Sequence, residues 1–200
     1  DERRLQAAKL FQRARLDRIK AHWLGSRTLT DAGFQVSDSA LGAALEKGVE
    51  DIEASNDTME LLTVESRLTK RLFKLACGAV DYGEFRRAKR GTGTDPANRF
   101  LDHGNYLAYG LAATATWVLG LPHGLAILHG KTRRGGLVFD VADLAKDAII
   151  LPQAFLCAMR GDDEQTFRQA CIESLTRAEA LDFMIDTIKD VALRQAEAGP

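Results

Sequence analysis

Residues 3–23 read RRLQAAKLFQRARLDRIKAHW, and their apolar side chains recur at the spacing of one face of an α-helix. The apolar positions are Leu5, Ala8, Leu10, Phe11, Ala14, Leu16 and Ile19. A strand would instead alternate apolar and polar residues with a period of two. This stretch therefore predicts a helical domain.

The helical period continues along the chain and is broken by glycine-rich segments. Predicted helices run from Ser37 or Asp38 to about Ala54, Asp57 to about Val80, Asp95 to about Leu119, Asp140 onward, and Asp163 to about Ala196. Residues 81–95 and 129–136 are rich in glycine and charge, which indicates loops. The sequence has four prolines and almost no strand-like alternation. We predict an all-α fold, a bundle of six or more helices in a single domain over residues 1–200.

Composition places the chain among globular proteins. It has 200 residues, of which 46% are hydrophobic and 28% charged. No run of about 18 uncharged apolar residues occurs, so we expect no transmembrane helix and no membrane partner. Cys77, Cys157 and Cys171 are odd in number and lie in apolar surroundings, which favours buried thiols in a reducing, cytoplasmic compartment.

Charge is uneven along the chain although the net charge is −1. Residues 1–20 carry seven basic and three acidic residues, and residues 65–90 carry eight basic and three acidic. Residues 36–60 carry seven acids and one lysine, and residues 162–190 carry eight acids and three basic residues. One interpretation is ordinary solvated helix faces; the other is a basic side that binds a polyanion.

Glu65 interrupts an apolar stripe that Leu61, Leu68 and Leu72 form at helical spacing. A carboxylate in such a stripe costs several kcal/mol if it stays charged and unpaired. It must pair with a cation, take up a proton or bind a metal. A salt bridge to Arg67, Lys70 or Arg71 is the simpler alternative.

A second unusual segment begins at His129, where an apolar run enters a glycine-rich turn containing Lys131, Arg133 and Arg134. Asp140, Asp143 and Asp147 then fall on one line of a helix. The simpler alternatives are a helix N-cap for Asp140 and a packed, hydrogen-bonded ring for His129. Asp143, one turn further in and flanked by apolar residues, has no such simple explanation.

Glu65, His129 and Asp143 together offer oxygen and nitrogen ligands without sulfur. That set suits Mg²⁺ or Mn²⁺. A divalent ion beside a basic turn is typical of phosphoryl chemistry, because the metal polarises a phosphoryl oxygen and the arginines neutralise developing charge.

Three segments resemble the CRISPR adaptation integrase family (Cas-one), specifically its subtype I-F branch. They are ESRLTKRLFKLA (residues 65–76), DPANRFLDHGNYLAYGLAA (residues 95–113) and the segment from Leu119 to Asp147, which includes HGKTRRGGLVFDVADLAKD (residues 129–147). The order of the motifs matches as well. The resemblance covers most of residues 57–160 and implies the helical C-terminal catalytic domain alone, without the family's β-rich N-terminal domain.

The resemblance places the family's catalytic metal ligands on Glu65, His129 and Asp143, with Asp140 as a further acidic position beside the metal. It implies a metal-dependent DNA endonuclease and integrase that inserts protospacer DNA into the CRISPR array. The 3′-hydroxyl of the incoming DNA attacks a phosphodiester of the repeat. The implied partners are DNA, a second copy of the protein, and a Cas-two subunit fused to the interference helicase-nuclease.

Phosphate contacts are expected from the basic turn and from the loop before residue 95. In this interpretation Lys131, Arg133 and Arg134 hold phosphates near the metal, and the duplex is guided by Arg86, Arg87, Lys89 and Arg90. Tyr106 and Tyr109 are expected in the core. The alternative function is a non-catalytic helical domain that binds DNA or a partner.

Overall fold

The computed structural model describes residues 2–129 and 135–197, and every regular element in these ranges is a helix. In chain order they are α1 (Glu2–Gly25), α2 (Arg27–Asp31), α3 (Asp38–Ala54), α4 (Thr58–Gly78), α5 (Pro96–Val118), α6 (Gly136–Ala145), the π-helical η1 (Lys146–Ile150), α7 (Leu151–Arg160), α8 (Glu164–Arg177) and α9 (Ala180–Glu197). The predicted all-α bundle is confirmed. None of these helices is both long enough and apolar enough to cross a bilayer.

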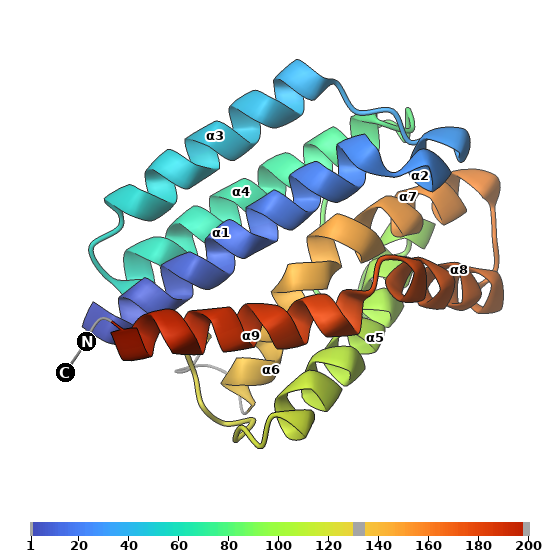
Figure 1. Cartoon of the computed structure of the whole chain (residues 1–200). Coiled ribbons are helices and arrows are strands. Elements are labelled where there is room, and N and C mark those ends of the chain that lie inside the picture. The colour runs from blue at the N-terminus through green and yellow to red at the C-terminus, as the bar shows by residue number, and fades with distance from the viewer. Residues whose placement is uncertain (1, 130–134, 198–200) are drawn as a thin grey trace.

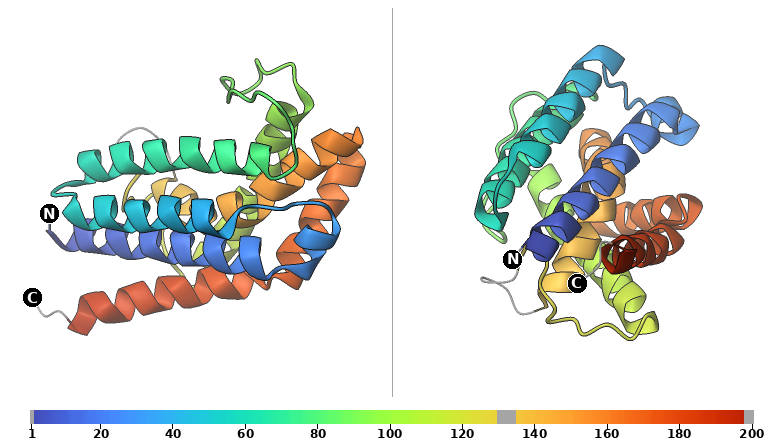
Figure 2. Two further views of the ribbon diagram at one scale, coloured as in Figure 1. Left: turned by 90° about the horizontal axis from the view of Figure 1, so that it is seen from above. Right: turned by 60° about the vertical axis from the view of Figure 1, so that its left-hand side comes forward.

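Four long helices lie side by side along the length of the molecule. In Figures 1 and 2, α1 runs between α3 and α9, and α4 packs against both α3 and α1. The continuous run α6–η1–α7 passes through the interior, between α1 and the steeply inclined α5 (Figure 1). Most of residues 137–157 are buried, so this run forms the centre of the core.

Several predicted helix starts are confirmed by their caps. The side chains of Ser37, Asp57, Asp95 and Asp163 each accept a hydrogen bond from a backbone N–H in the first turn of the following helix. The predicted single helix from Asp163 to Ala196 is wrong. It breaks into α8 and α9 at Glu179, which adopts a left-handed conformation with φ of 48°.

The π-helical segment η1 is explained by a proline and a tryptophan. Pro152, at the start of α7, has no N–H to donate to the carbonyls one turn back. The indole Nε1 of Trp23 supplies a donor instead, to the carbonyl oxygens of Asp147 and Ala148 at 3.1 Å each. Trp23 is itself buried, edge-on to Phe34 at 5.2 Å between ring centroids. Helix α1 therefore fixes an irregular backbone at the centre of the core.

The three cysteines are free thiols and all are buried, as predicted. Burial raises the pKa of Cys157 to about 12, and it raises the pKa of Cys171 further. These thiols therefore stay protonated at neutral pH and act as small apolar side chains.

Gly104 is a point of close contact between α5 and the core. A Cβ placed there would overlap Ile150 Cγ2 and lie 2.9 Å from Phe167 Cζ. We expect Gly104→Ala to lower the free energy of unfolding by about 1–3 kcal/mol, because a packed core resists an added methyl. Urea denaturation measures the loss.

Gly110 provides the matched control on the same helix, since a Cβ there meets no atom within 4 Å. Gly110→Ala should stabilise α5 by about 0.5–1 kcal/mol through helix propensity alone. Equal effects of the two substitutions would show that Gly104 is not in tight contact.

Candidate functional site

Asp140 organises the loop that presents His129. Its carboxylate accepts the backbone N–H groups of Ile127, Leu128 and His129 at 2.9–3.1 Å, and its Oδ1 lies 2.7 Å from His129 Nδ1. The N-cap alternative for Asp140 is wrong, because α6 begins at Gly136 and places Asp140 one turn inside the helix. The Asp140 carboxylate can only accept a hydrogen bond, so Nδ1 of a neutral His129 ring carries the proton. Nε2 then presents a lone pair.

Asp143 faces that second nitrogen. Its Oδ2 lies 3.9 Å from His129 Nε2, is buried, and has no hydrogen-bond partner in the part of the chain that the structure describes. Its Oδ1 accepts a hydrogen bond from Lys146 Nζ at 2.7 Å. Burial would raise the pKa of Asp143, but the charges of Lys146, Arg15 and His129 outweigh burial and lower it. Asp143 is therefore an anion, and one of its oxygens accepts no hydrogen bond from the described residues.

Glu65 is paired through Arg15 of α1, and not through its basic neighbours on α4. Its Oε1 lies 3.3 Å from Arg15 Nη1 and accepts a hydrogen bond from Thr69 Oγ1 at 3.0 Å. The Arg15 side chain is only 1% exposed and also donates from Nε to Asp147 Oδ2 at 2.7 Å. The salt-bridge alternative for Glu65 thus holds with a partner fifty residues away.

The charges of this cluster act on one another. Burial would lower the pKa of His129, but its hydrogen bond to Asp140 and the negative charges of Asp143, Asp140 and Glu65 raise it above the usual value. Arg15 is likewise stabilised by Asp147, Glu65 and Asp143. The predicted site residues Glu65, His129, Asp140 and Asp143 therefore lie in one electrostatic cluster.

The cluster offers a divalent cation a pair of ligand atoms. His129 Nε2 and the unpartnered Asp143 Oδ2 face each other, and Asp140 orients the imidazole as outer carboxylates do at metal centres. Among residues 2–129 and 135–197, no three His, Cys, Asp or Glu side chains stand close enough to hold a metal ion as they are placed. Glu65 would have to turn from Arg15 to complete such a set.

A cavity of about 680 Å³ opens beside Glu65 and Lys146. Aromatic and cationic side chains line it together: the Arg90 guanidinium lies 4.7 Å above the Tyr106 ring, and Tyr109 packs edge-on to Phe139 at 4.9 Å. The core prediction for Tyr106 is wrong, since this side chain is half exposed, while Tyr109 is only partly buried. Such a lining suits an unpaired nucleotide, with rings for the base and cations for the phosphate.

The residues predicted to bind DNA fall into two groups. Lys131, Arg133 and Arg134 lie outside the described residues. On the loop before α5, the exposed residues are Arg86, Lys89 and Arg90, whereas Arg87 is half-buried and bonded to Asn98 Oδ1 at 2.8 Å and to Asp102. Arg87 therefore holds this loop against α5.

Arg15 and Lys146 belong to this cluster but are not among the residues predicted from the sequence. Arg15 carries a recognisable signal, because it lies in the apolar stripe of α1 at i+4 from Phe11 and i−4 from Ile19, as Glu65 does on α4. Lys146 follows Asp143 by three residues, the spacing of a helical ion pair.

Residues 1–169 match the family profile described as "CRISPR associated protein Cas1". The chain is 70% identical over 194 residues to a CRISPR-associated endonuclease Cas1 of Pseudomonas aeruginosa (strain UCBPP-PA14), which covers 97% of this chain and 60% of that protein. It is 59% identical over 200 residues to the Cas1 endonuclease of Pectobacterium atrosepticum, covering 98% of this chain and 60% of that protein. The chain thus spans about 60% of the length of these relatives.

Solved Cas1 structures share the fold. A Cas1 protein from Thermotoga maritima superposes with a TM-score of 0.72 at 18% identity, over 97% of this chain and 65% of that one. TtCas1 in complex with DNA superposes with a TM-score of 0.60 at 21% identity, over 88% of this chain and 62% of that one. With the profile match over most of its length, the chain belongs to the Cas1 family.

Proposed function

We propose that this chain is the helical catalytic domain of a subtype I-F Cas1 integrase, a metal-dependent DNA endonuclease that inserts protospacer DNA into the CRISPR array. The observation that carries the proposal is the facing pair of His129 Nε2 and Asp143 Oδ2, 3.9 Å apart, with the second atom buried and without a hydrogen-bond partner among residues 2–129 and 135–197. A buried carboxylate oxygen without a partner is costly, and a cation between the two atoms would remove that cost.

In this proposal Mg²⁺ or Mn²⁺ is held by His129, Asp143 and Glu65. When bound, the ion supplies Lewis-acid polarisation of a phosphoryl oxygen and favours an ionised attacking hydroxyl. Asp140 acts as a positioning residue because it fixes the His129 ring and the loop before it. Lys146 neutralises Asp143 from the side of the cavity.

The proposed reaction is a transesterification. The 3′-oxygen of the incoming DNA forms a bond to phosphorus of the repeat, and the bond from that phosphorus to the adjoining 3′-oxygen breaks. Such a step depends chiefly on alignment and on charge stabilisation. Arg90 lines the cavity, and Arg86 and Lys89 are exposed on the same loop. These three residues are proposed to contact the DNA backbone, with Lys131, Arg133 and Arg134 of the basic turn.

We propose a homodimer that joins a Cas-two subunit fused to the interference helicase-nuclease. The resemblance to subtype I-F in residues 65–76, 95–113 and 129–147 supports this assignment. TtCas1, a protein of the same fold, was solved as a complex with DNA, which supports DNA as the proposed ligand.

The test compares DNA turnover by two histidine variants in Mn²⁺ and in EDTA. His129→Ala should abolish cleavage and strand transfer on branched DNA with a free 3′-hydroxyl. His123→Ala should leave both unchanged, because His123 is an exposed residue of the preceding loop. Wild-type turnover by His129→Ala would refute the assignment.

A second candidate function is metal-independent DNA binding. This candidate is favoured because Glu65 is engaged by Arg15 and Thr69. Only His129 and Asp143 then face each other, and two ligand residues are fewer than a metal site of three requires. DNA binding that is equal with and without Mn²⁺, with no turnover in either, would favour this candidate. The salt dependence of binding would then count the phosphates contacted.

Mn²⁺ binding should weaken as the pH falls. The metal takes the neutral imidazole, and the pKa of His129 is raised, so a proton competes with the metal over a wider range than at an ordinary histidine. Apparent affinity should fall about tenfold for each pH unit below that pKa and level off above it. Calorimetric titration with Mn²⁺ measures this, and an affinity that does not change between about pH 5 and pH 9 would contradict it.

A further inference from the structure

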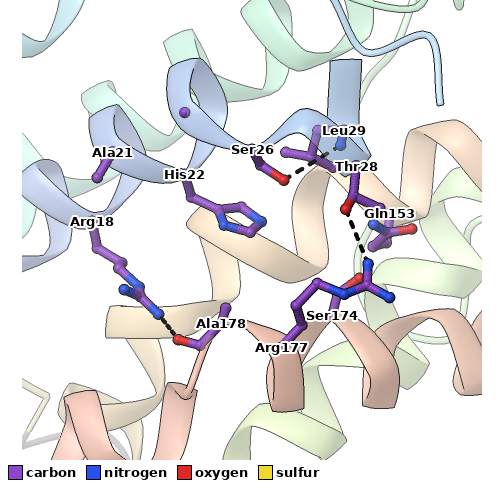
Figure 3. Close-up of a pocket in the computed structure, with 11 residues that line it drawn as sticks. Arg18, Ala21, His22, Ser26, Thr28, Leu29, Gln153, Ser174, Arg177 and Ala178 are labelled. Atoms are coloured by element: carbon purple, nitrogen blue, oxygen red, sulfur yellow. Dashed lines mark hydrogen bonds between the residues drawn. The ribbon is translucent and has the colours of Figure 1, made fainter. Parts of the chain in front are cut away.

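A second polar cavity lies at the C-terminal end of α1, where this helix meets α2, α7 and the end of α8 (Figure 3). Its volume is about 270 Å³, and it shares no lining residue with the cavity beside Glu65. Its polar lining includes Arg18, His22, Thr28, Gln153, Ser174 and Arg177. No carboxylate of the described chain lines it.

Two nitrogen atoms at this cavity are buried without a partner in the described structure. They are Arg18 Nε and His22 Nε2. Arg18 caps the end of α8, because its Nη2 donates to the carbonyl oxygen of Ala178. The cap uses Nη2, and it does not account for the burial of Nε without a hydrogen-bond partner. Buried polar atoms of native proteins nearly always have partners, so two orphans at one cavity indicate a missing hydrogen-bonding group.

The cavity is electropositive. In Figure 3 the His22 ring is seen between Arg18 on one side and Arg177 on the other. Arg177 Nη1 donates to Thr28 Oγ1 at 3.0 Å, which ties the guanidinium to the rim. Burial and the positive charge of Arg18 lower the pKa of His22 to about 4. Glu179 lies within electrostatic range of Arg18 but does not line the cavity.

We propose that this cavity binds a phosphate group, held by the guanidinium groups of Arg18 and Arg177 and by the ring of His22. Arginine is the side chain best suited to a planar fork of hydrogen bonds to phosphate oxygens. The cavity is many times larger than the roughly 30 Å³ that one water occupies in the liquid, so a tetrahedral ion fits with waters. The same chemistry would recognise free phosphate or a phosphate of the DNA backbone.

The test follows the His22 ring resonances by NMR while inorganic phosphate is added. Binding should move them saturably in the parent protein. Arg177→Gln should weaken phosphate binding at least tenfold, and it should fold normally because Arg177 is exposed. Arg27→Gln is the matched control, since Arg27 is an exposed arginine of the adjoining α2 that does not line the cavity. It should change the affinity less than twofold.

A duplex without terminal phosphates identifies the source of the group. If the duplex displaces phosphate from the parent protein but does not bind at this cavity in Arg177→Gln, the group recognised is a phosphate of the DNA backbone. If the duplex leaves phosphate binding unchanged, the ligand of the cavity is the free ion or a nucleotide. His22 resonances that respond to neither ligand, or equal affinities of the two arginine variants, would overturn the proposal. None of these outcomes depends on the metal, so the proposed nuclease function is tested separately.

Discussion

Asp143→Asn should weaken Mn²⁺ binding by more than about a hundredfold and bring metal-dependent DNA turnover to background. Loss of outer carboxylates at metal sites costs about 10–100-fold, and a direct ligand should cost more. The amide keeps the shape of the side chain and still accepts a hydrogen bond from Lys146, whose ammonium group keeps the nearby negative charge of Asp147, so the fold should survive. Electron paramagnetic resonance of Mn²⁺ gives binding without reference to activity.

Asp186→Asn is the control for the change of charge. Asp186 is 72% exposed and pairs only with Lys189 of its own helix among the described contacts. Its amide variant should bind Mn²⁺ as the parent does. If Asp143→Asn also binds Mn²⁺ with parental affinity, the assignment of Asp143 as a ligand fails.

Arg15→Met should lower the free energy of unfolding by about 3–5 kcal/mol, because it leaves the buried carboxylate of Asp147 without its cation. Glu65 would lose the same partner, and Thr69 Oγ1 would lose the hydrogen bond that Arg15 Nη2 donates at 2.6 Å. Urea denaturation followed by circular dichroism measures the change.

Arg13→Met, two residues away on α1, supplies the comparison. Arg13 also pairs with a carboxylate, Glu53, at 2.7 Å, but the two side chains are 51% and 49% exposed. A pair so exposed contributes less than about 1 kcal/mol. Similar losses for the two variants would mean that the ion pairs of Arg15 with Asp147 and Glu65 are solvated and contribute little to stability.

The fold class followed from local pattern, and so did the caps at Ser37, Asp57 and Asp95, since a cap is formed by residues within one turn. The break at Glu179 could not be predicted, because a left-handed residue other than glycine leaves no compositional mark. The predicted start at Asp140 is four residues later than the observed start of α6 at Gly136, for a different reason. Its N-cap, Gly135, has no side chain to donate or accept.

The candidate site also has one part that the sequence predicts and one part that it does not. His129, Asp140 and Asp143 lie within fifteen residues, and their spacing with the family resemblance was enough to group them. The ion pair of Arg15 and Glu65 joins α1 to α4 across fifty residues. It cannot be predicted from local pattern, because only the packing of the two helices brings these side chains together. The unused oxygen of Asp143 likewise depends on where Lys146 lies.

The indole of Trp23, hydrogen-bonded to the carbonyl oxygens of Asp147 and Ala148, gives this protein an optical reporter next to the ion pair of Arg15 and Asp147. The sequence has two tryptophans, and the other, Trp117, is 75% exposed. Acrylamide therefore quenches Trp117 and spares Trp23, and a Trp117→Phe background isolates the buried emitter. Its fluorescence lifetime then follows any rearrangement of the backbone around Asp147 as metal or nucleic acid is added, without an attached dye.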